Sequence, residues 1–226
     1  MLQRKVNLTS DDMRALSLLV CLSVGCLAQK PQPCSSPSLM SGGLSVSTQS
    51  DRLVALAKYT YDAVGQRIRL RELGTYDNKT FFHLDILLLY RQGIMYKIDS
   101  KDSTCVKKPL TEDFHPLAVP KDASLVGQFV LGSSSVPGEG ILVNTWAGEL
   151  QMRRGTAEYL STVTEFGCLP VSTMFCTDKK GWVMVSFFNN IAGLADPQDF
   201  TPPPFCNGAR PEEEEEENLA AFFSLF

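Results

Sequence analysis

The chain has 226 residues, of which 44% are hydrophobic and 20% are charged, with 21 Lys+Arg against 25 Asp+Glu. This composition is that of a globular protein and excludes a disordered chain, a collagen and a long coiled coil. Six consecutive glutamates at residues 212–217 account for the acidity, so the nearly neutral remainder offers no broad basic surface for nucleic acid.

The N-terminal residues have the order of a secretory signal peptide. Arg14 precedes an apolar run that ends in small residues, and cleavage after Ala28 fits this pattern best. The run is shorter than the roughly 20 apolar residues of a membrane-spanning helix. The alternative is a buried N-terminal helix. We expect residues 1–28 to be removed, and we predict no transmembrane segment in the remaining chain.

Short alternating or apolar segments fill the body of the chain and predict antiparallel β-structure. In residues 66–71, arginine alternates with aliphatic residues, which predicts a strand with Ile68 and Leu70 inside and the three arginines in water. This strand forms a hairpin with residues 53–61, and a second hairpin joins residues 81–90 to 94–99. Further strands are predicted at residues 44–48, 125–131, 141–146, 149–153, 158–163, 171–176 and 182–188.

Two proline-rich segments interrupt this pattern. Residues 107–121 contain three prolines and predict a long ordered loop or crossover, and residues 196–206 are predicted to lie extended over the surface, held by Cys206. One domain at residues 29–210 accommodates all the strands, followed by an acidic, Phe-rich tail at 211–226. The predicted fold class is an all-β sandwich or barrel.

Five cysteines remain after signal cleavage, at positions 34, 105, 168, 176 and 206. They include no C-x-x-C pair, which argues against zinc and thioredoxin-like chemistry. An oxidising compartment favours long-range disulfide bonds. Because five is odd, at least one thiol is free or pairs between chains.

No motif predicts an enzyme or an organic cofactor. The sequence lacks a Gly-rich phosphate loop, a nucleophile elbow, a zinc-protease helix and an EF-hand loop. Cys176 could act as a nucleophile, but an unpaired cysteine that packs as a small apolar residue is the favoured interpretation. Asn78-Lys79-Thr80 is an N-glycosylation acceptor in a predicted loop, and we expect it to be occupied.

Several short motifs, taken together, resemble the ependymin family in order and spacing. They cover residues 32–206 and are Gln32-Pro33-Cys34, Tyr61-Asp62 with Arg67-Ile68-Arg69, Ile86-Leu87-Leu88-Leu89-Tyr90 before Gly93-Ile94-Met95, Cys168-Leu169-Pro170-Val171, and Asp196-Pro197 with Phe200-Thr201-Pro202-Pro203 and Cys206. The mammalian ependymin-related type is the form that the sequence resembles most.

This resemblance implies a secreted glycoprotein, with the lysosomal lumen as the location of related forms. It implies two stacked antiparallel sheets that curve as a half-barrel around a deep apolar pocket, similar to bacterial lipoprotein carriers. It also implies calcium as an associated ion, for which the sequence identifies no ligands beyond the acidic run at 212–217. The disulfide bonds implied are Cys34–Cys168 and Cys105–Cys206, which leave Cys176 unpaired.

Strand parity assigns the residues of the implied pocket. Side chains on the opposite side from Arg67, Lys58, Asp85 and Lys97 are taken as inward. The predicted pocket residues are Tyr59, Tyr61, Ile68, Leu70, Leu84, Ile86, Leu88, Tyr90, Ile94, Tyr96 and Ile98. A solidly packed core is equally consistent with these strands, and only the resemblance favours a pocket.

Two functions are therefore open from the sequence. The first is a carrier that binds a hydrophobic small molecule or lipid. The second is an adhesive extracellular glycoprotein that acts through calcium and self-association, with a homodimer and the extracellular matrix as implied partners. Asn78 and the acidic tail are the residues that support the second function.

Overall fold

The structure is a computed structural model that describes residues 10–11, 13–15, 17–18, 30–49, 53–76, 80–111, 113–152, 155–177, 181–193 and 196–209. The chain consists of two compact units, Met1–Gln32 and Pro33–Phe226. In the first unit, the described residues between 10 and 18 are helical. None of the described helices is long and apolar enough to cross a membrane. Most of the predicted signal peptide and the tail at 211–226 lie outside the described residues.

The second unit consists of antiparallel strands with short 3₁₀ helices between and after them. In chain order these elements are β1 (Leu39–Thr48), β2 (Val54–Asp62), β3 (Arg67–Tyr76), β4 (Thr80–Leu89), η1 (Tyr90–Gln92), β5 (Ile94–Asp99), β6 (Thr104–Pro109), β7 (Ser124–Gly132), β8 (Gly140–Met152), β9 (Gly155–Thr164), β10 (Pro170–Thr177), β11 (Gly181–Ala192), η2 (Pro197–Phe200) and η3 (Pro204–Gly208).

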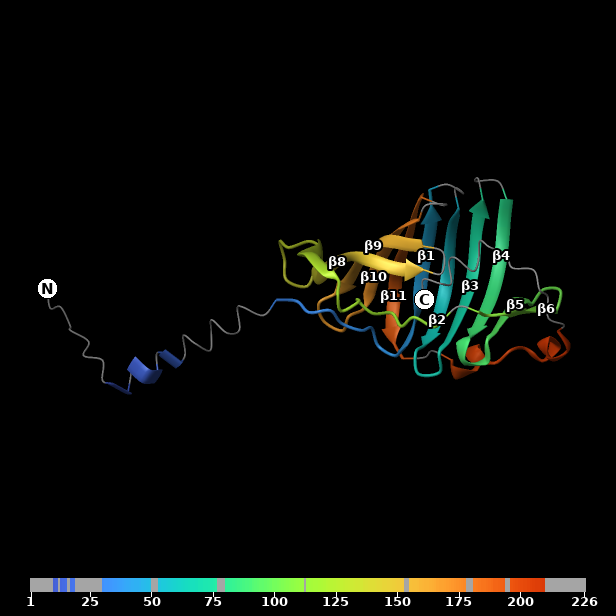
Figure 1. The fold of residues 1–226 in the computed structure, drawn as a ribbon, viewed down its shortest axis with the longest axis horizontal. Helices are drawn as coiled ribbons and strands as arrows, with labels where there is room; N and C mark the ends of the chain where they lie inside the picture. The colour runs from blue at the N-terminus through green and yellow to red at the C-terminus, as the bar shows by residue number, and fades with distance from the viewer. Residues whose placement is uncertain are drawn as a thin grey trace. The chain divides into compact units, whose positions relative to one another are not determined.

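The strands form one open sheet in the order β6-β5-β4-β3-β2-β1-β11-β10-β9-β8-β7. Each half is a meander of neighbouring strands, and β1 joins the halves by pairing with both β2 and β11 (Figure 1). The predicted all-β antiparallel fold is confirmed. The two sheets implied by the resemblance are continuous with each other through the β1–β11 pair.

Most predicted strands are present, and they are longer than the alternation of residues predicted. The predicted segments 141–146 and 149–153 fall, as far as residue 152, in one strand, β8. The strand β6 was missed, and its second half lies in the stretch 107–121 that was expected to be a loop on account of its prolines. Pro109 is the last residue of β6, and β6 is an edge strand, where proline is tolerated.

One face of β1–β4 and β11 carries the main hydrophobic core, and we call it the core face. The strand register aligns Tyr61 with Ile68 and Leu88, and Tyr59 with Leu70 and Ile86. Met40, Leu44 and Val46 of β1 and Val183, Val185 and Phe187 of β11 extend the same cluster. Aliphatic and aromatic side chains at every second position therefore fill this face.

The opposite face of β3 and β4, which we call the arginine face, is also partly buried. The sequence placed Arg67, Arg69 and Arg71 in water, but this was wrong for Arg69, which is only 7% exposed. Arg69 Nε and Nη2 donate to the two carboxylate oxygens of Asp85 at 2.9 and 2.8 Å. A bidentate ion pair compensates two charges that burial alone would disfavour.

The C-terminal segment covers this arginine face. Arg69 Nη1 donates to the Asp199 carbonyl oxygen at 2.9 Å, and Arg71 Nη2 donates to Asp199 Oδ1 at 2.6 Å. Thr60 Oγ1 donates to Asp199 Oδ2 at 2.8 Å. Figure 1 shows the red segment of η2 and η3 beside the ends of the strands. The proline-rich stretch is therefore fixed to the sheet by charged hydrogen bonds as well as by Cys206.

Both disulfide bonds implied by the resemblance are present. Cys34 is bonded to Cys168, and Cys105 of β6 is bonded to Cys206 of η3. Cys176 on β10 is a free thiol. The two bonds connect segments separated by 134 and 101 residues, so each holds one of the irregular segments to the sheet.

Candidate functional site

Most of the predicted pocket residues lie together on the core face. Seven of them are buried: Tyr59, Tyr61, Ile68, Leu70, Leu84, Ile86 and Leu88. Tyr90 is partly buried and packs against the same cluster. Ile86 is 1% exposed and Leu88 is fully covered, so in this structure the face is occupied by side chains.

The structure separates the three predicted residues of β5 from this group. Tyr96 pairs with Leu87, Ile98 with Asp85 and Ile94 with Leu89, which places all three on the arginine face. The prediction treated Lys97 as a marker of the solvent side. At β5 a lysine does not mark the side opposite the core, because η2 and η3 bury apolar side chains on the arginine face there.

On that side, a second cluster takes up the apolar residues of β4 and β5. Leu87, Leu89, Ile98, Phe200 and Cys206 form its buried part, with Tyr96 and Cys105 packed against it. The cluster therefore holds η2 and η3 against the sheet. We assign Tyr96 and Ile98 to this structural contact and not to the pocket.

The core face is covered by residues 110–111 and 113–119, which we call the crossover segment. Its side chains Leu110, Phe114 and Leu117 pack against the core cluster. The Phe114 ring stacks on Tyr61 with centroids 6.0 Å apart and meets Tyr90 edge-on at 5.2 Å. Aromatic contacts of this kind add about 0.5–1.5 kcal/mol to the burial of the ring.

Backbone hydrogen bonds fix the two ends of the crossover segment. At one end, Leu110 N donates to the Gly93 carbonyl at 2.9 Å. At the other end, Ser36 N donates to the Leu117 carbonyl and Val119 N donates to the Cys34 carbonyl, which ties the segment to the Cys34–Cys168 disulfide bond. Phe114 lies between these two anchors, so it is the side chain through which the middle of the segment contacts the core face.

The two tyrosines of β2 have polar partners at the rim of this face. Tyr59 Oη donates to Asn190 Oδ1 at 2.7 Å, and Tyr61 Oη accepts from Leu117 N at 3.0 Å. Gly42 makes room for the first pair, since a Cβ there would lie 2.8 Å from Asn190 Oδ1. Burial raises the pKa of both Tyr59 and Tyr61, so each phenol is neutral at physiological pH.

Glu72 is an ionisable residue on the core face that was not predicted from the sequence. It is 7% exposed, and its neighbours across the sheet are Ala57 and Leu84. Desolvation by burial raises the pKa of Glu72 to about 7. The sequence contained a sign of this burial, because Glu72 has the same strand parity as Ile68 and Leu70 and interrupts an apolar face.

The other half of the sheet carries two buried polar atoms that have no hydrogen-bond partner among the described residues. They are Trp146 Nε1 on β8 and Tyr159 Oη on β9. Desolvation raises the pKa of Tyr159, and the charge of Asp122 adds to the effect. Buried polar atoms are normally paired, so these two are open to a water molecule or to a polar group of a ligand.

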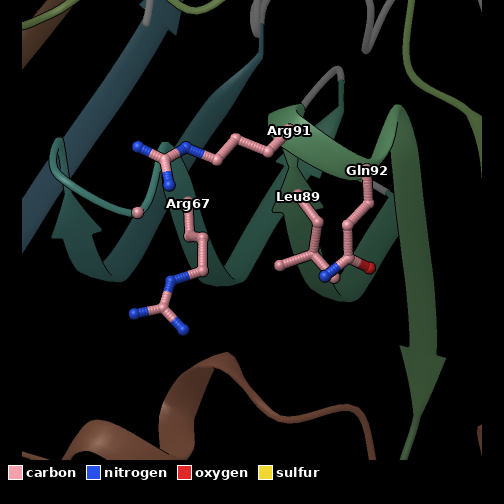
Figure 2. Close-up of a pocket in the computed structure, with 5 residues that line it drawn as sticks. Arg67, Leu89, Arg91 and Gln92 are labelled. Carbon is pink, nitrogen blue, oxygen red and sulfur yellow. The ribbon is translucent and has the colours of Figure 1, made fainter.

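A groove of about 230 Å³ lies on the surface beside the β2–β3 turn and η1. Figure 2 shows Arg67, Leu89, Arg91 and Gln92 around it, with both guanidinium groups on the same side. These groups already have protein partners. Arg67 pairs with Asp62 and lies 4.4 Å from the Phe200 ring, and Arg91 Nη2 donates to the Val64 carbonyl at 2.7 Å. We therefore do not assign the groove as an anion site.

Calcium association and glycosylation of Asn78 remain predictions. Within those residues, no group of three or more His, Cys, Asp or Glu side chains is arranged to hold a metal ion. The acidic run at 212–217, which was the sequence's candidate for calcium attraction, and the predicted glycosylation site Asn78 both lie outside the described residues.

Comparison with known proteins identifies relatives that match most of the chain. Ependymin-2 of Carassius auratus is 34% identical over 214 residues, covering 92% of this chain and 97% of the relative. Ependymin-1 of Oncorhynchus mykiss is 36% identical over 217 residues, covering 94% and 96%. Mammalian ependymin-related protein 1 of Mus musculus is 31% identical over 184 residues, covering 80% of each chain. These two fish ependymins therefore match at higher identity than the mammalian protein.

A solved structure of an uncharacterized conserved protein from Thermus thermophilus aligns with a TM-score of 0.49 at 12% identity, covering 89% of this chain and 99% of that one. The family model described as Ependymin matches residues 77–206. This match and the full-length relatives agree with the order of the sequence motifs. The chain therefore belongs to the ependymin family.

Proposed function

We propose that the protein is a secreted, non-catalytic glycoprotein that binds an apolar or lipid-like small molecule on its core face, beneath the crossover segment. The observation that carries this proposal is the way the face is covered. A single segment anchored at both ends contacts a broad apolar surface through Phe114, next to Tyr61 and Tyr90. An apolar ligand that displaced Phe114 would find aromatic and aliphatic walls in its place.

The crossover segment also explains why side chains fill the proposed binding face in this structure. Movement of Phe114 away from Tyr61 would expose apolar surface, and a ligand would restore its burial at about 25 cal/mol per Å². The anchors at Leu110 and Leu117 would keep the segment in place during such a movement. Two long-range disulfide bonds support an oxidising, extracellular or lysosomal location.

Replacement of Phe114 tests this function directly. We expect wild-type protein to bind a fluorescent fatty acid, and Phe114→Ala to bind it several-fold more tightly, because the ligand no longer has to displace the ring. Phe166→Ala is the matched control, since Phe166 is 81% exposed and should leave binding unchanged. If neither wild type nor Phe114→Ala takes up the probe while both remain folded, the core face is a solid core and the proposal fails.

A further inference from the structure

The described residues include four buried carboxyl groups, and one of them differs from the other three in its surroundings. Asp62, Asp85 and Asp199 each pair with an arginine of β3. Glu72 is also buried, with 7% of its surface exposed, but its carboxylate has neither a cation nor a hydrogen-bond donor as a partner among the described residues. Buried carboxylates are normally paired, so the position of Glu72 points to a partner outside the chain.

The arginines of β3 do not supply this partner, because they lie on the other side of the sheet. Side chains alternate along a strand, so Glu72 projects to the core face, whereas Arg69 and Arg71 project to the arginine face. The residues directly across the sheet from Glu72 are Ala57 and Leu84. The carboxylate therefore lies on the same apolar face that the proposed ligand would occupy.

Glu72 and Phe114 lie towards opposite ends of this face. Phe114 stacks on Tyr61, which pairs with Ile68 of β3, and Glu72 follows Ile68 by four residues along the strand. Four residues of a strand span roughly 13 Å. Beyond Glu72, the partly buried Phe82 packs against the end of the apolar cluster. An alkyl chain that begins beneath Phe114 would therefore bring its other end to the carboxylate, near the rim of the face.

We propose that Glu72 binds the polar end of the apolar ligand, and that this ligand is an amine whose ammonium group donates to the carboxylate. The inference rests on the proposed function, because it concerns the ligand of the same face. An ionised carboxylate offers only acceptors, so it is complementary to an ammonium group and, less strongly, to a hydroxyl group. A fatty acid still binds through its apolar chain, but it brings a second negative charge to Glu72 and binds more weakly.

The destabilising effect of Glu72 on the free protein supports a role in binding. Burial raises the pKa of Glu72 to about 7, so above this pH the folded protein contains a desolvated negative charge without a compensating group. Glutamine has nearly the same size and no charge, so the fold itself gains no stability from a glutamate at this position. The carboxylate is already desolvated before the ligand arrives, so association only has to desolvate the ammonium group.

An ammonium group fits this position better than a metal ion does. In the part of the chain that the structure describes, no group of three or more His, Cys, Asp or Glu side chains could hold a metal ion, at Glu72 or elsewhere. One carboxylate is a sufficient partner for one ammonium group, whereas a calcium ion takes about six to eight oxygen ligands. The apolar cluster around Glu72 also favours a ligand with an apolar body.

Three ligands that share one alkyl chain test the inference at pH 8, where Glu72 is ionised. Dodecylamine, dodecanol and dodecanoate are titrated, below their micelle concentrations, into the full secreted chain, and calorimetry gives the Kd of each. We expect wild-type protein to bind the amine about tenfold more tightly than the carboxylate, or better, with the alcohol between them. Glu72→Gln should remove most of this preference, whereas Glu139→Gln, the same change at an exposed turn, should retain it.

Covalent capture locates the ammonium group independently. A water-soluble carbodiimide joins a carboxylate to an adjacent amine as an amide, and peptide mass spectrometry identifies the modified residue. Bound dodecylamine should modify Glu72 in preference to the exposed Glu139, and ethylamine, which lacks a long apolar chain, should show the reverse preference. Equal affinity for amine and carboxylate, or a preference that Glu72→Gln leaves unchanged, would overturn this inference and leave the proposed function intact. Absence of binding by all three dodecyl ligands would overturn the proposed function and this inference together.

Discussion

The buried carboxyl group of Glu72 gives the most quantitative prediction. Desolvation moves its pKa from the ordinary 4.5 to about 7 in the folded protein. Each pKa unit is worth about 1.4 kcal/mol, so a difference of this size corresponds to about 3 kcal/mol. Because the folded-state pKa is raised, the stabilisation from protonation is fully present below pH 4.5 and is lost as the pH rises through about 7.

Glu72→Gln replaces the ionisable group with a neutral one of nearly equal size. We expect the free energy of unfolding to rise by about 3 kcal/mol at pH 8 and to change little at pH 4, where Glu72 is protonated. At pH 8 this gain corresponds to a rise in Tm of about 6–12 °C for a chain of this length. Urea unfolding with the disulfide bonds intact, followed by tryptophan fluorescence at both pH values, measures the difference.

Glu139→Gln is the matched control, because Glu139 is exposed in the β7–β8 turn and should change neither value. Equal effects of Glu72→Gln at pH 4 and pH 8 would show that the carboxyl group is not desolvated. Destabilisation at pH 8 would show that the ionised carboxylate has a stabilising partner, which contradicts a pKa raised by burial.

Three further predictions concern the C-terminal segment and the glycan. Burial alone would raise the pKa of Asp199, but hydrogen bonds from Arg71 and Thr60, with the charges of Arg71 and Arg69, lower it on balance below 3.8. Asp199→Asn should therefore cost about 2 kcal/mol at pH 7, and progressively less as the pH falls below 3.8 through the lowered pKa of the folded protein, measured by urea unfolding. Removal of the Cys105–Cys206 bond by a double change to serine should cost about 4–5 kcal/mol and make residues 196–209 sensitive to protease, whereas Cys176→Ser should have neither effect. Expression in a secretory eukaryotic host should show one glycosidase-sensitive mass step that Asn78→Gln abolishes, and a step that persists in this variant would contradict the assignment.

Alternation along the strands was sufficient to predict the fold class and much of the core face. Ile68 and Leu70 face inward because arginines occupy the intervening positions, and a strand with one buried face has this period. The pairing of the four bonded cysteines came from the family resemblance, since five cysteines alone allow several arrangements.

The same alternation could not assign both faces where both are covered. At β5, Lys97 suggested a solvent side, yet the register places Tyr96 against Leu87 on a face that η2 buries. Arg69 is buried because Asp85 of β4 and Asp199 of η2 pair with its guanidinium group. Such partners are distant in sequence, so no local pattern contains them.

Native mass spectrometry of gently purified secreted protein shows whether the core face binds a ligand. We expect wild-type protein to retain the mass of an apolar small molecule or lipid, which collisional activation removes. We also expect Phe114→Ala to retain more of this mass than Phe166→Ala does. A mass of only the glycosylated polypeptide in all three proteins, together with no uptake of the fluorescent fatty acid, would contradict ligand binding at the core face.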